Sequence, residues 1–492
     1  MMLATKTFSQ DDQIAFARYS GDWNPIHVDP VYARRTQIGQ QVVHGMHALL
    51  WTLDAFARSS AELKRFRSLE VDFLKPIYLD EPIVANIIDS PSRMPGTRTL
   101  KIGLYAEGVA LVTIALNSSA PILTAARATY SGKQIAGASA IEPIALEIGD
   151  IRERAGVVPL VPSSPAFEDH YGHAVTGLGI RRFRGIATLS RLVGMECPGL
   201  HSLFMGAQLA LGRGDRRDDL HFAVQEVDDR FQLIRMAIKG AGLDGLVTAR
   251  VRAKPIVQPA LAEIAQGVAP GEFSGQTPLI IGGSRGLGEL TAKIFAAGGA
   301  RPTISYFMGE DDARRVADEI VKAGGECSII RYDVKLNAGS QLGQLSAAPP
   351  QQVYYFPTSP IARRKSEPFE TVLLDEFLKT YVTGFYDLCR SLRRSFPQNL
   401  SVFYPSTSYA DHRPRDMTEY VMAKLAGEVL CADLARRDRG LKILVRRLPP
   451  LLTDQTAGIS TVGSSTEAVE IVLSVVREMA RMNGVRAKAD AV

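Results

Sequence analysis

The chain has 492 residues, of which 46% are hydrophobic and 22% are charged. This composition is typical of globular domains and excludes a disordered chain. The net charge of +5 is too small to indicate nucleic-acid binding, although it would suit an anionic acyl carrier. The length predicts about three to four domains at roughly 100–200 residues each.

Neither export nor membrane insertion is predicted. The stretch Met1–Gln13 has no basic segment followed by an apolar run. No apolar run approaches the roughly 18 residues that a membrane span needs. The four cysteines have no metal-type or C-x-x-C spacing, which suits a reducing compartment. We therefore expect a cytoplasmic protein without a metal, a nucleic-acid partner or a membrane partner.

Three blocks follow one another along the chain. The first two each begin with a helix-like stretch and end in alternating strands, and the third alternates strand and helix from Pro278 onward. Polar or Pro/Gly-rich seams separate the blocks. We predict domains over residues 1–130, 150–262 and 275–485, with seams at Ser131–Ala140 and Pro255–Gly275.

The first two blocks resemble an internal repeat. Gly, His and Leu recur at an offset of 154 between His44–Leu50 and Pro198–Phe204. Gly108–Thr113 resembles Leu243–Thr248 at a shorter offset. Each repeat is expected to be an apolar helix wrapped by an antiparallel sheet, with coincidence as the alternative. The strands expected after the two helices are Leu69–Phe73 and His221–Val224.

The most specific motif is S-G-D-W-N-P-I-H-V-D at Ser20–Asp29, followed by V-H-G at Val43–Gly45. Adding water to a 2-enoyl thioester needs a base, an acid and dipoles that stabilise charge on the thioester oxygen. Asp22 and His27 lie five residues apart, so both can contact one water molecule. The run resembles the MaoC-like, (R)-specific enoyl-CoA hydratases, which have the hotdog fold.

This resemblance implies that Asp22 and His27 form a catalytic dyad, that Asn24 orders their loop, and that Gly45 supplies a backbone donor to the thioester oxygen. Taken singly, Asp22 would be a turn cap and His27 a core histidine. We expect His44 and His47 to be structural and Asp29 to be an N-cap. At the offset of 154 the dyad positions become Thr176 and Arg181, which predicts a pseudo-dimer with one active half.

A strand, a glycine-rich turn and a helix start follow at Leu279–Gly288. Glycines let the backbone approach a pyrophosphate, and a helix N-terminus favours anions. The run resembles the G-x-x-x-G-x-G of short-chain dehydrogenases/reductases. The next strand ends at Tyr306 rather than at an acid, and Arg285 can meet a 2′-phosphate, so NADPH is favoured over NADH. The expected cofactor-binding residues are Gly282, Ser284, Arg285, Gly286, Leu287, Gly288, Tyr306, Asp333, Val334, Tyr420, Lys424 and Thr453.

The same resemblance implies a catalytic Tyr-x-x-x-Lys at Tyr420 and Lys424, in which the lysine lowers the pKa of the phenol. A hydroxyl upstream would hold the substrate oxygen, and Ser406, Thr407 and Ser408 are candidates. The chain departs from the family at Tyr355–Ser359, at Tyr381 where an Asn is expected, and at Pro449–Pro450. Two alternatives follow: an active reductase with an altered pocket, or a degenerate nucleotide-binding module.

The predicted fold class is therefore an α+β double hotdog followed by an α/β Rossmann-type, doubly wound parallel sheet. The predicted function is dehydration or hydration of an acyl thioester, on coenzyme A or acyl-carrier protein, coupled to NADP(H)-dependent 3-oxoacyl reduction in fatty-acid-like or polyketide-like biosynthesis. The alternatives are an oxidative, β-oxidation-type enzyme and a non-enzymatic acyl-thioester scaffold. We expect a homo-oligomer.

Overall fold

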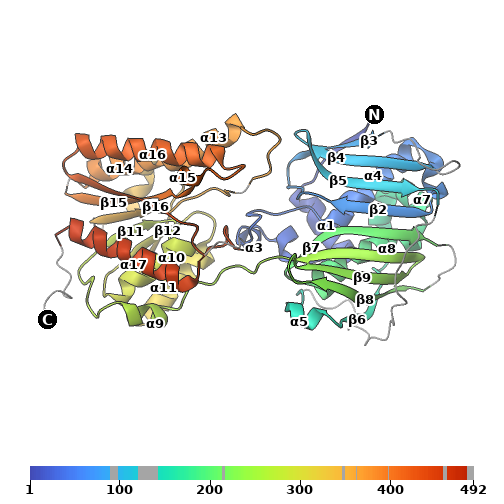
Figure 1. The fold of residues 1–492 in the computed structure, drawn as a ribbon, viewed down its shortest axis with the longest axis horizontal. Coiled ribbons are helices and arrows are strands. Elements are labelled where there is room, and N and C mark those ends of the chain that lie inside the picture. Colours follow the sequence, from blue (N-terminus) through green and yellow to red (C-terminus); the bar gives the residue numbers. More distant parts are fainter. Residues whose placement is uncertain are drawn as a thin grey trace. The chain divides into compact units, whose positions relative to one another are not determined.

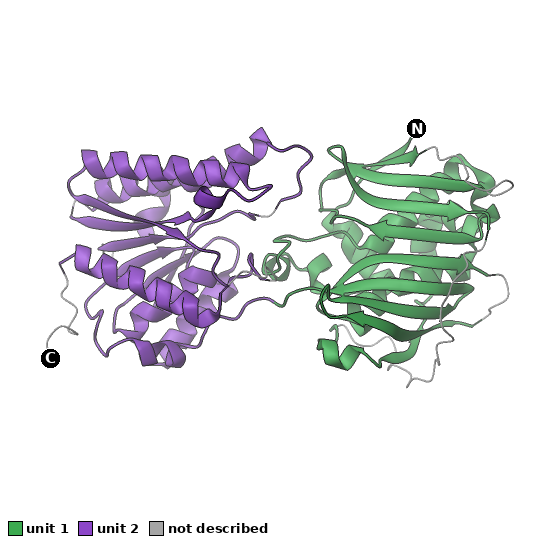
Figure 2. Cartoon of the chain, in the orientation of Figure 1, with its two compact units in different colours: residues 1–254 green, residues 255–492 purple. Residues whose placement is uncertain are grey.

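The computed structural model describes residues 1–88, 98–119, 142–212, 217–345, 349–361, 363–396, 398–457 and 463–484. The chain divides into two compact units, Met1–Lys254 and Pro255–Val492 (Figure 2). The predicted seam Ser131–Ala140 lies outside the described residues. Unit 1 includes the first predicted domain and residues 150–254 of the second, whose predicted end at residue 262 falls in unit 2.

One ten-stranded antiparallel sheet runs through unit 1 (Figure 1). Its strand order is β1-β3-β4-β5-β2-β7-β10-β9-β8-β6. The sheet has a first half, β1 to β5, and a second half, β6 to β10. In each half, the first strand along the chain lies at the outer edge, and the third, fourth, fifth and second strands follow toward the middle of the sheet. The second strands of the two halves, β2 and β7, pair in the middle. The bounds are β1 Met2–Thr7, β2 Ser68–Phe73, β3 Pro82–Ile88, β4 Thr99–Ala106, β5 Val109–Asn117, β6 Ala155–Pro159, β7 Ser202–Leu211, β8 Asp219–Asp228, β9 Leu233–Gly240 and β10 Leu243–Val251.

Two long helices pack against this sheet, one from each half. Helix α4 (Gly45–Ser59) buries most of its apolar residues, and α8 (Ile180–Arg191) continues into a π-helical turn, η2 (Leu192–Glu196). Both helices and the inner faces of the strands form a single hydrophobic core. The shorter helices of the unit are α1 Gln10–Ser20, α2 Pro25–Val28, α3 Pro30–Ala33, η1 Ala61–Arg65, α5 Ile148–Ile151, α6 Pro165–His170 and α7 Gly172–Leu178.

The topology corrects the predicted alignment of the repeat. β5 and β10 occupy corresponding places in the strand order, and the turns before them place Glu107–Gly108 and Ala241–Gly242 at positive φ in the same way. The offset of 154 at the helix starts is wrong, because Gly45 begins α4 whereas Gly199 lies between η2 and β7. The strand β8, which contains His221–Val224, is likewise the third strand of its half and not the counterpart of β2.

The cause of the misalignment is a difference in length before the long helix. Residues 8–44 separate β1 from α4, whereas only residues 160–179 separate β6 from α8. The motif of Ser20–Asp29 lies within the longer segment. Thr176 and Arg181 lie in α7 and α8, so neither is the counterpart of a dyad residue, and the second half has no equivalent loop.

Unit 2 contains a six-stranded parallel sheet of order β13-β12-β11-β14-β15-β16, which is a Rossmann-type, doubly wound arrangement. One hydrophobic core includes side chains of α10, α11 and α17, and a second includes side chains of α12, α14 and α16. The strands are β11 Pro278–Ile281, β12 Thr303–Tyr306, β13 Ser328–Arg331, β14 Gln352–Tyr355, β15 Leu400–Thr407 and β16 Leu441–Leu448.

The helices of unit 2 are α9 Leu261–Ile264, η3 Ala265–Gly267, α10 Gly286–Ala297, α11 Glu310–Lys322, α12 Ala338–Gln341, η4 Leu342–Leu345, α13 Thr371–Leu378, the π-helical η5 Lys379–Thr383, α14 Gly384–Ser395, α15 Tyr409–His412, α16 Thr418–Arg437 and α17 Ser465–Met482. Within the described ranges of both units, none of the helices has the length and apolar character needed to cross a membrane.

Candidate active site

A break between two helices positions the predicted dyad. Helix α1 ends at Ser20, and Gly21 caps it with a φ of 73°, a left-handed conformation that suits glycine. Asn24 then caps α2 by accepting a hydrogen bond from the Ile26 amide, and Pro25 is the first helical residue. The chain therefore turns between Asp22, which is buried, and His27, which lies on the one-turn helix α2.

The Asp22 carboxylate contacts both its own loop and residues of the second half. Ser190 Oγ donates a hydrogen bond of 2.6 Å to Asp22 Oδ2, and the Asn24 amide donates one of 3.2 Å to Oδ1. Gly194 of η2 packs so closely that a Cβ built there would lie 2.2 Å from Oδ1. Burial raises the pKa of the Asp22 carboxyl, while His27 and Ser190 oppose this shift.

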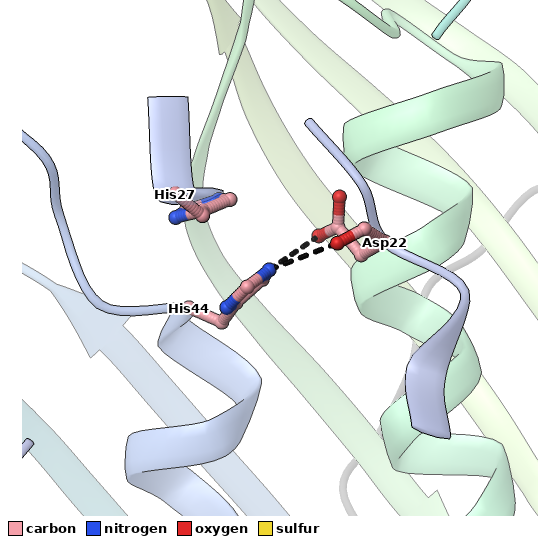
Figure 3. Close-up of side chains that lie close together, drawn as sticks. All are labelled: Asp22, His27 and His44. Carbon is pink, nitrogen blue, oxygen red and sulfur yellow. Dashed lines mark hydrogen bonds and ion pairs between the residues drawn. The ribbon is translucent and has the colours of Figure 1, made fainter. Parts of the chain in front are cut away.

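His27 is held in one tautomer. Its Nδ1 lies 2.8 Å from the carbonyl oxygen of Val42, which can only accept, so Nδ1 carries the hydrogen and Nε2 of the neutral ring is an acceptor. Burial lowers the pKa of His27, although Asp22 opposes this. Polar atoms of Asp22, His27 and His44 lie within 4.8 Å of one another (Figure 3), so the structure brings the predicted dyad together.

His44, expected to be structural, completes this cluster. Its ring stacks on that of His27 with centroids 3.9 Å apart. Its Nε2 lies 3.0 Å from the backbone oxygen of Asp22 and 4.0 Å from Oδ2 (Figure 3). Its Nδ1 lies 2.9 Å from Gln13 Oε1. The cluster has residue types that ligate zinc, and it is the one such grouping of three found across the described ranges.

Asn24 connects the loop to the second half. Its Nδ2 lies within hydrogen-bonding distance of the carbonyl oxygens of Gly194, Gly199 and Leu200, at 2.8, 3.2 and 3.2 Å. Because its Oδ1 also caps α2, one buried side chain links the start of α2 to the segment after α8.

Gly45 is the first residue of α4, and its helix start is the predicted source of donors for a thioester oxygen. A Cβ at this position would lie 2.8 Å from Phe73 Cζ, so a larger residue would force the Phe73 ring to move. Asp29 caps α3 by accepting hydrogen bonds from the amides of Val31 and Tyr32, which confirms its predicted role.

A cavity of about 430 Å³ lies beside α1 in the same unit. Its lining combines aromatic and imidazole side chains, among them Tyr19, His47, Phe167 and Tyr171, with small residues and the charged Asp12 and Arg18. His47 lies one turn along α4 from His44, and its Nε2 is 2.7 Å from the Tyr171 hydroxyl. Burial lowers the pKa of His47 to about 3, so its ring is neutral at physiological pH.

Two residues that contact Asp22 were missed by the sequence analysis, Ser190 and Gly194. They lie about 170 residues from the motif and belong to no pattern of their own, so the sequence holds no signal for them. Glu196 and Cys197, which lie near His201 in the sequence, do not form a second reactive pair, because Glu196 is paired with Arg191 at 2.9 Å and burial raises the pKa of Cys197 to about 12.

The glycine-rich turn of unit 2 has the close packing that a nucleotide cradle requires. Gly282 and Gly286 have φ of 78° and 57°, and a Cβ at Gly288 would lie 2.1 Å from the carbonyl oxygen of Gly282. Gly286 begins α10, with Arg285 as its N-cap. The residues present therefore fit a pyrophosphate at this helix start, with Ser284 and Leu287 inside the same turn.

The remaining predicted nucleotide residues lie around this turn. Arg285 Nη1 pairs with Asp454 Oδ2 at 3.1 Å, so its charge is partly compensated. Thr453 lies next to Gly286, with its methyl carbon 3.6 Å from a Cβ built there. Tyr306 ends β12, and Asp333, followed by Val334, lies after β13, where its Oδ1 accepts from the Lys335 amide.

Of the three hydroxyl candidates, only Thr407 acts on Tyr420. A hydrogen bond with Thr407 lowers the pKa of Tyr420, but burial outweighs it and raises that pKa to about 12. Ser406 Oγ instead bonds Glu428 at 2.5 Å, and Ser408 precedes α15. The structure therefore brings Thr407 and Tyr420 together and directs Ser406 elsewhere.

Lys424 lies nearer to Pro405 and Tyr381 than to Tyr420, so the lowering of the Tyr420 pKa by this lysine stays a prediction. Its Nζ donates to the carbonyl oxygen of Pro405 at 2.7 Å and lies 4.0 Å from the ring centroid of Tyr381, compared with 5.9 Å for Tyr420. Burial lowers the pKa of Lys424 to about 7. Tyr381, which replaces the expected Asn, thus provides the aromatic face on which the lysine packs.

Comparisons with known proteins agree with the N-terminal motif. Residues 3–93 match the family described as MaoC like domain, so the chain contains a MaoC-like domain at its N-terminus. Such a domain implies the hotdog fold, and the predicted resemblance is confirmed for this segment.

Curated relatives match parts of the chain. Peroxisomal multifunctional enzyme type 2 of Mus musculus is 35% identical over 71 residues, which cover 14% of this chain and 9% of that protein. The mitochondrial 3-hydroxyacyl-[acyl-carrier-protein] dehydratase of Arabidopsis thaliana is 48% identical over 42 residues, covering 8% and 25%. The (R)-specific enoyl-CoA hydratase of Aeromonas caviae is 26% identical over 109 residues, covering 22% and 81%. The chain thus spans only a small part of the first two relatives.

Solved structures also resemble the chain. A short-chain dehydrogenase/reductase of Serratia marcescens covers 42% of the chain and 91% of its own length, with 21% identity and a TM-score of 0.38. FolM alternative dihydrofolate reductase 1 of Brucella canis, complexed with NADP, covers 42% and 90%, with 15% identity and a TM-score of 0.37.

Proposed function

We propose that unit 1 is a double hotdog, a pseudo-dimer with one active half, and that it is an (R)-specific 2-enoyl-thioester hydratase/3-hydroxyacyl-thioester dehydratase. The mirrored strand order about β2 and β7 supports the pseudo-dimer. The convergence of Asp22 and His27 beside the start of α4 is the observation on which the activity rests.

In the hydration direction, the water oxygen adds to C3 of the enoyl thioester. His27 accepts one water proton at Nε2, the acceptor atom fixed by the bond to Val42, and Asp22 orients the same water through its carboxylate. A proton passes from the dyad to C2, so that H and OH have been added across the double bond. The first amides of α4, beginning at Gly45, stabilise the charge on the thioester oxygen. The cavity beside α1, lined by His47 and by the second half, accommodates the acyl chain.

Replacement of Asp22 by Asn tests this proposal with little change in volume. We expect hydration of crotonyl-CoA, followed by loss of enoyl absorbance, to fall by about 10²-fold or more, the usual effect of losing a general acid–base group. Asp11→Asn, on the exposed face of α1, is the matched control. An unchanged rate of hydration in the Asp22→Asn variant would show that Asp22 does not take part in the reaction.

For unit 2 we propose binding of NADPH and reduction of a 3-oxoacyl thioester. The cradle of Gly282, Gly286 and Gly288 would hold the pyrophosphate, and Arg285 would turn from Asp454 to a 2′-phosphate. Bound NADPH would supply a hydride to the 3-oxo carbon. Tyr420 would give a proton to the substrate oxygen, which Thr407 would hold in place.

The position of Lys424 favours a second candidate function, a nucleotide-binding module without reductase activity. NADPH consumption with acetoacetyl-CoA distinguishes the two, because Tyr420→Phe should abolish it if unit 2 is a reductase. NADPH binding without turnover in the unaltered protein would support the second function instead.

Together these activities would act on consecutive intermediates, and their fusion would raise the local concentration of the shared one. NADPH use would favour the biosynthetic direction, on a coenzyme A or acyl-carrier-protein thioester, over oxidative breakdown. We also propose that the protein is a cytoplasmic homo-oligomer that needs no metal.

A further inference from the structure

A buried arginine lies beside the dyad without a full set of partners. Arg252 follows β10 and is only 8% exposed. Its Nη2 donates to the Tyr32 hydroxyl at 2.9 Å and to the Leu200 carbonyl oxygen at 2.8 Å. Its Nε and Nη1 have no hydrogen-bond partner in the described part of the chain. A buried guanidinium with unpaired N–H groups costs free energy that an anion would offset.

Arg252 contacts the segments that hold the dyad in place. The Leu200 carbonyl oxygen accepts from both Arg252 Nη2 and Asn24 Nδ2, so these two side chains meet at one atom. Tyr32, which Arg252 also bonds, lies on α3, directly after the loop of the dyad. The positive charge of Arg252 contributes to lowering the pKa of His27.

His201 adds a second unpaired group. It is 7% exposed, its Nδ1 has no partner among the described residues, and its carbonyl oxygen accepts from the Arg252 amide at 2.7 Å. Burial, followed by the charges of Arg252 and Lys254, lowers the pKa of His201 to about 4, so the neutral ring can donate at Nδ1. The acid that opposes this shift, Glu147, is exposed and bonded to Lys254.

We propose that Arg252, with His201 beside it, is a subsite for an anionic oxygen group of the acyl thioester. This inference rests on the proposed hydratase function and narrows its substrate class. A carboxylate on the acyl group and a phosphate of the thioester carrier share the chemistry that a guanidinium recognises. Either would supply the acceptors that Nε and Nη1 lack.

A purely structural role for Arg252 makes a different prediction. If the side chain only clamps Tyr32 to the Leu200 carbonyl, its loss would disturb the dyad and slow every substrate alike. A subsite instead changes the ratio of kcat/KM values between an anionic substrate and a neutral one. Ratios are therefore the informative measurement.

The experiment compares the unaltered chain, Arg252→Gln and Arg250→Gln. Arg250 is an exposed residue of β10, so its variant removes the same charge without touching the subsite. Four substrates are used: the crotonyl and fumaryl thioesters of coenzyme A and of N-acetylcysteamine, which has no phosphate. Fumaryl replaces the methyl group of crotonyl with a carboxylate.

If the acyl group carries the anion, Arg252→Gln lowers the fumaryl-to-crotonyl ratio of kcat/KM on both carriers by about 30-fold or more, as expected for a lost buried charge contact. If the carrier phosphate is the anion, the same variant lowers the ratio of coenzyme A to N-acetylcysteamine thioesters for both acyl groups. Arg250→Gln should change neither ratio. Ratios in Arg252→Gln equal to those of the unaltered chain would overturn the subsite.

Two further measurements keep the proposal open to refutation. Should Arg252→Gln fail to fold, Tyr32→Phe removes one acceptor that orients the guanidinium and should shift the same ratio in the same direction. Should the unaltered chain hydrate none of the substrates, calorimetric binding of fumaryl-CoA and crotonyl-CoA tests the subsite alone. Equal affinities in the unaltered and Arg252→Gln chains, for both ligands, would then rule it out.

Discussion

Gly194→Ala is the sharpest test of how Asp22 is positioned. The added Cβ would lie 2.2 Å from Asp22 Oδ1 and 2.7 Å from Cγ, so the carboxylate must move by about 1 Å to reach an ordinary contact. A displacement of this size in a reacting group costs about 10²-fold in rate. Alanine is intrinsically favoured over glycine in a helix by about 1 kcal/mol, so propensity does not explain a loss.

The assay is kcat/KM for hydration of crotonyl-CoA, with thermal unfolding as a check of the fold. Gly172→Ala is the matched control, because it lies in the same half at the start of α7 and a Cβ there meets nothing within 4 Å. We expect the control to retain full activity. A folded Gly194→Ala chain with the activity of the control would refute the assignment of Asp22 or its position against η2.

Three further outcomes are expected. In Ser190→Ala the pKa of Asp22 should rise further, because the hydrogen bond from Ser190 lowers it in the unaltered chain. Since the reaction needs an ionised carboxylate, the acid limb of the kcat/KM profile should move to higher pH, and an unmoved limb would show that Ser190 does not influence Asp22. Asn24→Ala should reduce the free energy of unfolding, measured by urea denaturation, by about 1–3 kcal/mol, because the Gly194 carbonyl oxygen loses the donor Asn24 Nδ2. In unit 2, Lys365→Met should lower the free energy of unfolding by about 3–5 kcal/mol, because it leaves the buried Glu419 carboxylate without the cation that lies 2.8 Å away. The double variant Lys365→Met/Glu419→Gln should recover part of that loss, because it removes the uncompensated charge.

Local spacing allowed the sequence to predict the features that depend on neighbouring residues. Asp22 and His27 lie on one loop, and the glycines from Gly282 to Gly288 lie in one turn, so their roles follow from distances along the chain. The environment of Lys424 could not be predicted in this way. Its Nζ packs on the ring of Tyr381, which lies on a separate element, η5. The sequence shows that Tyr381 stands where Asn is expected, but it does not show that this ring contacts Lys424.

The alignment of the two halves failed for a related reason. A short match at a fixed offset cannot detect that the segment before the long helix differs in length between the halves. The strand order about β2 and β7 resolves this, because it depends on pairing rather than on residue identity. The contacts of Ser190 and Gly194 with Asp22 depend on the packing of α8 and η2 against the loop, which spacing along the chain does not predict.

The second half therefore contributes to the proposed reaction although it has no dyad. Ser190 bonds the carboxylate of Asp22, the carbonyl oxygen of Gly194 accepts from Asn24, and Arg252 comes from the strand end next to His201. None of these contacts requires acid–base chemistry from the second half. The loop that contains Asp22 and Asn24 therefore depends on the second half for its position, and the subsite that we propose at Arg252 would make the choice of substrate depend on it as well.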